Sequence, residues 1–176
     1  MKTGYLTTLT IKPIIMNQTL ILTGVLLGVG AVEAANAATP VKGKKAPNVV
    51  FIIADDLGYG DLSCYGQEKL QTPNIDRLAL EGMRFTQCYS GTTVSAPSRA
   101  SLMTGLHTGH SPIRGNKGVK PEGDMSLPAG TNNIFQVFKN VGYTTGCFGK
   151  WGLGAPNAEG DPNAQGVDDF FGYNGQ

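Results

Sequence analysis

An unbroken run of apolar and β-branched residues, 48–54, ends at two adjacent aspartates, Asp55 and Asp56. A short segment that is apolar on both faces is typical of a central strand in a parallel sheet, where helices cover both sides. The run therefore predicts such a strand, with two carboxylates at its carboxyl end.

Helix and strand patterns alternate along the rest of the chain. Residues 72–82 predict a helix that Thr72 caps, and residues 133–140 predict another. Residues 83–89 and 143–148 have strand character. This alternation indicates the α/β class, with an open, mainly parallel sheet flanked by helices.

The amino-terminal segment has the pattern of a secretory signal peptide. Lys2 and Lys12 precede an apolar stretch, 20–31, and Ala35-Asn36-Ala37 offers a cleavage site. The apolar stretch is too short and too glycine-broken for a comfortable membrane span. We therefore interpret residues 1–37 as a signal peptide and expect export.

The expected location is the periplasm or the exterior of the cell. Met16 is an alternative first residue of the signal peptide, because it lies close to the apolar stretch. Residues 38–47, which contain three lysines, predict an exposed linker. Residues 48–176 then form the expected catalytic part.

Composition limits the partners. Fourteen basic residues nearly balance thirteen acidic ones, which gives no reason to expect nucleic acid or an anionic membrane surface. Cys64, Cys88 and Cys147 are an odd number for an exported chain, so at least one is free or pairs outside the chain. We expect Cys88 and Cys147 to be buried as small apolar side chains.

A compact unit, 93–105, combines a hydroxyl with an arginine. Pro97 suits the first turn of a helix and Gly105 can end it, so Ser95 lies at the helix start, where an anion is favoured. Arg99 follows one turn later on the same face and can reach the Ser95 oxygen. Such an oxygen is well placed to attack a sulfuryl or phosphoryl group.

Further candidates lie at the carboxyl ends of predicted strands, where parallel sheets bind ligands. Asp55 and Asp56 follow the first strand, and Lys150 follows the third. Adjacent carboxylates repel unless a cation lies between them, and hard oxygen ligands suit calcium or magnesium. Asp61, on the glycine-rich turn, is expected to stabilise that turn.

The unit that starts at Ser95 resembles the first signature of the type I sulfatases, in the alkaline phosphatase superfamily. Residues 55–61, 72–79 and 142–154 also resemble that family. The resemblance implies an alkaline-phosphatase-like fold and a Cα-formylglycine made from Ser95, whose hydrate is the nucleophile. It further implies Ca²⁺ on Asp55, Asp56 and the Ser95 position.

The activity implied is hydrolysis of sulfuric esters, of aryl sulfates or sulfated glycans. Arg99 and Lys150 would offset charge on the sulfuryl group, with Lys150 holding a sulfate oxygen. A serine at the nucleophile position implies an anaerobic-type radical maturation enzyme as partner. Two alternatives stay open: a phosphoryl or phosphonate ester hydrolase of the same superfamily, and a truncated remnant without turnover.

The chain departs from the family pattern at Gly152, where a histidine is common. The resemblance covers residues 47–176, whereas sulfatases are much longer and later supply an Asp-Asn pair, a histidine and a second lysine. We therefore interpret the chain as an amino-terminal fragment that binds sulfate esters poorly. We expect Trp151 to be a packing residue.

Two loop features carry weaker expectations. His107 and His110 are spaced as a metal pair but have no evident third ligand, so ordinary hydrogen bonds are the preferred interpretation. Arg114 and Asn116 lie downstream of the nucleophile helix and could face the substrate.

Overall fold

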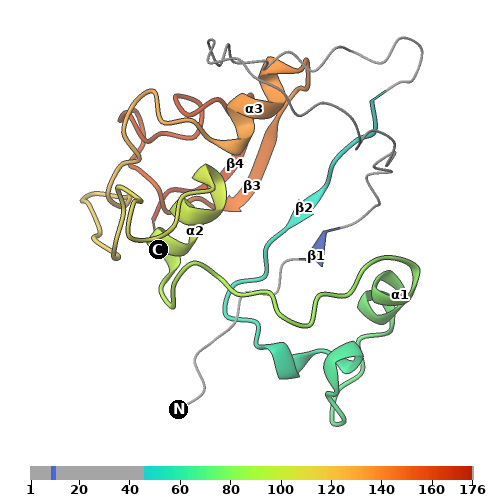
Figure 1. Ribbon diagram of the computed structural model, residues 1–176. Coiled ribbons are helices and arrows are strands. Elements are labelled where there is room, and N and C mark those ends of the chain that lie inside the picture. Colours follow the sequence, from blue (N-terminus) through green and yellow to red (C-terminus); the bar gives the residue numbers. More distant parts are fainter. Residues whose placement is uncertain (1–8, 11–45, 176) are drawn as a thin grey trace, which may run out of the picture.

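The computed structural model describes residues 9–10 and 46–175 (Figure 1). The predicted signal peptide, except Leu9 and Thr10, and most of the linker lie outside these residues. Within them, no helix has the length and apolar character needed to cross a membrane. The strands are β1 (Leu9–Thr10), β2 (Phe51–Ile52), β3 (Gly146–Lys150) and β4 (Asp169–Tyr173); the α-helices are α1 (Pro73–Glu81), α2 (Ser95–Thr104) and α3 (Ile134–Asn140).

The longest strands of the described structure form a parallel pair, and Lys150 ends the first of them. β3 and β4 pair in parallel, with Gly146 opposite Asp169 and Lys150 opposite Tyr173. Helices α2 and α3 lie beside this pair (Figure 1). The expected α/β class is confirmed, and the strand predicted at 143–148 is found slightly later, as β3.

The first predicted strand differs from expectation. Only Phe51 and Ile52 are in strand conformation, and they pair antiparallel with β1 rather than in parallel. Val49, Val50 and Ile52 are more than half exposed. A central parallel strand buries both faces only when neighbours flank it, and in the described part of the chain β2 has no parallel partner.

The strand predicted at 83–89 is wrong, because the described structure has none there. The segment runs past one of two short 3-10 turns (Tyr59–Asp61 and Ser63–Tyr65), and the Tyr65 hydroxyl donates to the Phe85 carbonyl over 2.8 Å. Cys88 is exposed rather than buried, because this segment packs against little else.

The helices predicted at 72–82 and 133–140 are confirmed as α1 and α3, with bounds that agree within one residue. The predicted cap of α1 is not formed. The Thr72 hydroxyl does not cap α1; it donates to Asp76 Oδ1 (3.0 Å) and accepts from the Ser63 N–H (3.0 Å). Asn133 does cap α3, because its Oδ1 accepts from the N–H groups of Phe135 and Gln136.

The core forms where α2 packs on the segment after β3. Ala96, Ala100, Ile113, Leu127, Trp151 and Leu153 are all buried in one cluster. The Trp151 indole N–H donates to the Gly160 carbonyl over 2.7 Å, which satisfies its polar atom. The expected packing role of Trp151 is confirmed.

Close backbone contact in this core leaves no room for a side chain at Gly154. A Cβ there would overlap the backbone of Gly160. We expect Gly154→Ala to destabilise the fold by about 2 kcal/mol or more, because overpacking forces the backbone to move. Gly60→Ala, where a Cβ meets nothing within 4 Å, is the control and should change stability by less than about 0.5 kcal/mol. Urea unfolding followed by fluorescence of Trp151, the only tryptophan, measures both.

An ion pair links α3 to the loop before β4 and makes stability depend on pH. Lys139 Nζ bonds Asp168 Oδ1 (2.6 Å), and the Thr145 N–H donates to Asp168 Oδ2 (2.9 Å). The Lys139 bond, followed by the Thr145 backbone bond, lowers the pKa of Asp168 from 3.8 to about 2. The stabilisation is therefore present above about pH 4 and is lost as the pH falls toward 2.

We expect Asp168→Asn to remove this acid-dependent part of the stability. The difference in free energy of unfolding between wild type and variant should shrink as the pH falls from 4 to 2. Asp169→Asn changes a neighbouring exposed carboxylate and is the control. Denaturant midpoints over this pH range measure the effect; a constant difference would contradict it.

Candidate active site

Ser95 is the first residue of α2, as the sequence predicted. Val94 precedes it in extended conformation (φ −119°, ψ 156°) and supplies no side-chain cap. Arg99 Nε donates to Ser95 Oγ over 3.0 Å, which confirms the predicted contact one helical turn back. The hydroxyl is thus held at the helix start by a cation on its own helix.

The guanidinium of Arg99 reaches two other segments. One terminal nitrogen donates to the Lys150 carbonyl (2.9 Å), and the other lies 3.6 Å from Asp55 Oδ1. Arg99 is only 9% exposed, so these contacts replace water for most of its N–H groups. They join the start of α2, the end of β3 and the end of β2.

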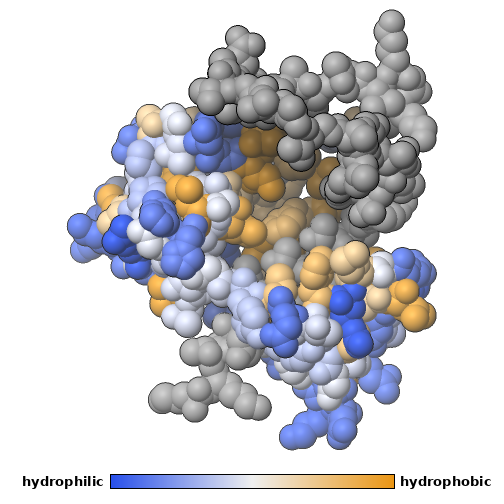
Figure 2. All heavy atoms as spheres, viewed as in Figure 1, coloured by the Kyte–Doolittle hydropathy of each residue, from blue (hydrophilic) through white to orange (hydrophobic). Residues whose placement is uncertain are grey.

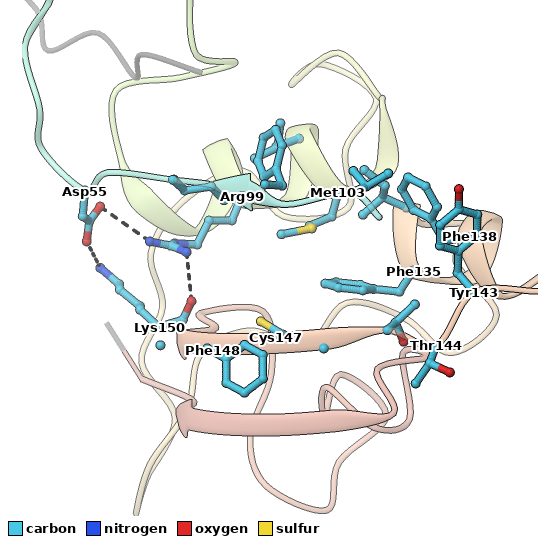
Figure 3. A pocket seen from close by; sticks show the side chains of 18 of the residues that line it. Asp55, Arg99, Met103, Phe135, Phe138, Tyr143, Thr144, Cys147, Phe148 and Lys150 are labelled. Carbon is cyan, nitrogen blue, oxygen red and sulfur yellow. Dashed lines mark hydrogen bonds and ion pairs between the residues drawn. The ribbon is translucent and has the colours of Figure 1, made fainter. Parts of the chain in front are cut away.

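Lys150 completes the cluster. Its Nζ lies 3.1 Å from Asp55 Oδ2, and its side chain is 15% exposed, whereas that of Asp55 is 46% exposed. Figure 3 shows Arg99 and Lys150 converging on Asp55. Two cations share one carboxylate, so the cluster beside Ser95 keeps a formal excess of one positive charge and favours an anion.

The second aspartate lies in the turn that follows β2. Asp56 is exposed and has φ 57°, a left-handed conformation that aspartate tolerates better than most residues. Asp61 stabilises this turn, as expected, by accepting the Gly58 N–H (2.6 Å). Among the described residues, no group of three or more His, Cys, Asp or Glu could hold a metal ion.

A cavity of about 490 Å³ lies between β2 and β3. Asp55, Arg99 and Lys150 form its polar end, and the rest of the wall is mainly apolar, including Met103 and Phe135 (Figure 3). Figure 2 shows apolar residues gathered in the recess on this side of the molecule. The charged cluster is therefore reached from solvent beside an apolar surface.

His107, His110 and Arg114 make ordinary contacts within their own loop. His107 Nδ1 accepts the Gly109 N–H (3.1 Å), and the rings of His107 and His110 have centroids 6.4 Å apart. Arg114 donates to the Gly109 carbonyl (2.7 Å). These bonds support the preferred interpretation of loop histidines.

Asn116 makes a contact that the sequence interpretation missed. Its Oδ1 accepts the N–H of Ala96, the residue after Ser95, over 2.9 Å. A signal for this contact exists in the sequence. The position before α2 is Val94, whose side chain cannot cap a helix, so the first N–H groups need water or an acceptor from elsewhere in the chain.

Gly152, where the family pattern often has histidine, lies in a left-handed backbone conformation. It is buried and has φ 70°, in the left-handed region where glycine carries no Cβ penalty. Its N–H donates to the Asn174 carbonyl (3.2 Å), which extends the β3–β4 pairing by one step.

Comparison with known proteins identifies relatives of this chain. The model of the Sulfatase family matches residues 47–176, well over half of the chain. N-acetylgalactosamine-6-O-sulfatase of Bacteroides thetaiotaomicron is 41% identical over 129 residues, covering 69% of this chain and 25% of that protein. Human arylsulfatase A is 43% identical over 132 residues, covering 73% and 25%.

A solved structure agrees with these matches. Ps i-CgsB in complex with k-i-k-neocarrahexaose superposes with a TM-score of 0.62 at 35% identity, covering 69% of this chain and 27% of that one. The chain spans about a quarter of the length of the curated relatives it matches.

The buried position of Arg99 makes its geometry testable. We expect Arg99→Lys to lower stability by about 2 kcal/mol, because a single ammonium cannot reach Ser95, Lys150 and Asp55 together. Arg77→Lys is the matched control and should change stability by less than about 0.5 kcal/mol, since the contact of Arg77 within the described residues is an exposed i,i+4 pair with Glu81 at 3.9 Å. If urea unfolding shows the same loss of stability for Arg99→Lys and Arg77→Lys, the three buried contacts of Arg99 do not contribute as described.

Proposed function

Since the chain belongs to the sulfatase family, we propose that it hydrolyses sulfate esters and that Ser95 carries the nucleophile. The observation that carries this proposal is the bond between Arg99 Nε and Ser95 Oγ, 3.0 Å long, inside a cluster with excess positive charge. A hydroxyl position at a helix start, bonded to one cation of a cluster that contains a second, suits attack on an anionic ester.

The residues have distinct parts in this proposal. The formylglycine made from Ser95 supplies an oxygen nucleophile as its hydrate. Arg99 orients that oxygen through Nε, and its burial keeps the guanidinium in one position. Lys150 holds a sulfuryl oxygen from the end of β3. Both cations offset charge that grows on the sulfuryl oxygens in the transition state, where preorganised charges act most strongly.

A calcium ion is part of the proposal, with Asp55, Asp56 and Ser95 as the residues that would hold it. Their oxygens are the hard donors that calcium prefers, and the Asp55 side chain is 46% exposed at the rim. Calcium takes roughly six to eight oxygen ligands, so these residues form part of a coordination shell. Bound there, the ion supplies further positive charge beside the sulfuryl group.

The proposed substrates are sulfated carbohydrates. One relative is named N-acetylgalactosamine-6-O-sulfatase, and one structural neighbour was solved with k-i-k-neocarrahexaose. We also propose secretion or periplasmic location, from the signal-peptide pattern of residues 1–37. An anaerobic-type radical enzyme is the proposed maturation partner, because the nucleophile position is serine.

Mass spectrometry of protein from its own host tests the modification. Trypsin releases the peptide Phe85–Arg99, and we expect it to lack two hydrogens, with fragment ions placing the loss at Ser95. Ser90 and Ser98 lie in the same peptide and are internal controls that stay unmodified. Ser95→Ala should abolish the loss. An intact Ser95 throughout would point to a phosphoryl-transfer relative or an inactive remnant.

A further inference from the structure

We propose that Asn116 is a positioning residue for Ser95, acting as a cap supplied to α2 from a distant loop. This inference rests on the proposed function for the importance of Ser95, but its geometry stands independently. The Asn116 side chain accepts the Ala96 N–H over 2.9 Å, across twenty residues of sequence.

Helix α2 needs an acceptor that its own sequence does not provide. The first N–H groups of a helix have no partner within the helix, and a Ser, Thr, Asn or Asp before it normally supplies one. Val94 occupies that position and makes no side-chain cap. Ala96 is fully buried in the structure, so its N–H is shielded from water and depends on an acceptor from the protein. Asn116 meets this requirement.

The capped N–H belongs to the peptide unit of the nucleophile position. The Ser95 carbonyl and the Ala96 N–H share one planar peptide group, so a bond to that N–H restrains rotation at Ser95. Arg99 holds Ser95 Oγ from the other side. Asn116 holds the backbone and Arg99 holds the side chain, so together they set the direction of the oxygen.

The loop that carries Asn116 is held on both sides. Ile113 is fully buried in the core, and the Lys117 N–H donates to Oδ1 of the fully buried Asp124 over 2.8 Å. The Asp124 N–H in turn lies 3.4 Å from the carbonyl of Gly154, four residues after Lys150. This path ties the start of α2 to the segment that follows β3.

Amide hydrogen exchange of the isotopically labelled full chain tests the cap. In Asn116→Ala, we expect the Ala96 N–H to exchange about five-fold faster, the effect of removing a helix cap, and the Ser95 Cβ resonance to shift. Asn116→Asp keeps the acceptor oxygen. In this variant the Ala96 N–H should exchange within about two-fold of the wild-type rate, and the Ser95 Cβ resonance should return to its wild-type position. Asn132→Ala, an exposed asparagine, is the matched control and should change neither.

Two results would overturn the inference. One is unchanged Ala96 exchange in Asn116→Ala; the other is faster exchange with an unmoved Ser95 resonance, which describes a cap that serves stability alone. If Asn116→Ala fails to fold, Asn116→Gln, whose longer side chain displaces the acceptor, replaces it with the same expectations.

The mass of the Ser95 peptide from protein made in its own host separates this inference from the proposed function. An unmodified Ser95 together with the expected Ala96 pattern removes the proposed function and leaves the cap. A modified Ser95 with unchanged Ala96 exchange removes the cap and leaves the proposed function.

Discussion

The Arg99 guanidinium is almost completely buried, and its N–H groups need acceptors from whichever segments surround it. The acceptors come from three places: Ser95 on the same helix, the carbonyl of Lys150 at the end of β3, and the carboxylate of Asp55 after β2. A buried cation that lost one of these partners would pay a large desolvation cost. The positions of α2, β3 and the Asp55 turn are therefore mutually dependent.

The same arrangement sets the electrostatics of the site. Asp55 lies within ion-pair distance of both Arg99 and Lys150, yet it remains the most exposed of the three side chains. The carboxylate is therefore the member of the cluster that solvent reaches most easily, while both cations are largely buried. An anion that arrives from solvent therefore meets cations that are already held in place.

Local signals predicted the helices well and the strands poorly. Pro73 and Gly82 bracket α1, and Pro97 and Gly105 do the same for the start and end of α2, because these residues act on the backbone wherever they occur. The run 48–54 yields only a two-residue strand, and 83–89 yields none. Strand formation depends on a hydrogen-bonded neighbour, and no local pattern states whether that neighbour is present.

The sequence by itself determined which chemical groups the site contains, and it determined the contact between Ser95 and Arg99, since helical periodicity places residues four apart on one face. It also placed Asp55 and Lys150 at strand ends. Only the tertiary structure decided that both cations would share one carboxylate and that Asn116 would accept a hydrogen bond at the start of α2. These contacts join residues 20 to 95 positions apart. Their distances depend on how the whole core packs, which no short-range pattern encodes.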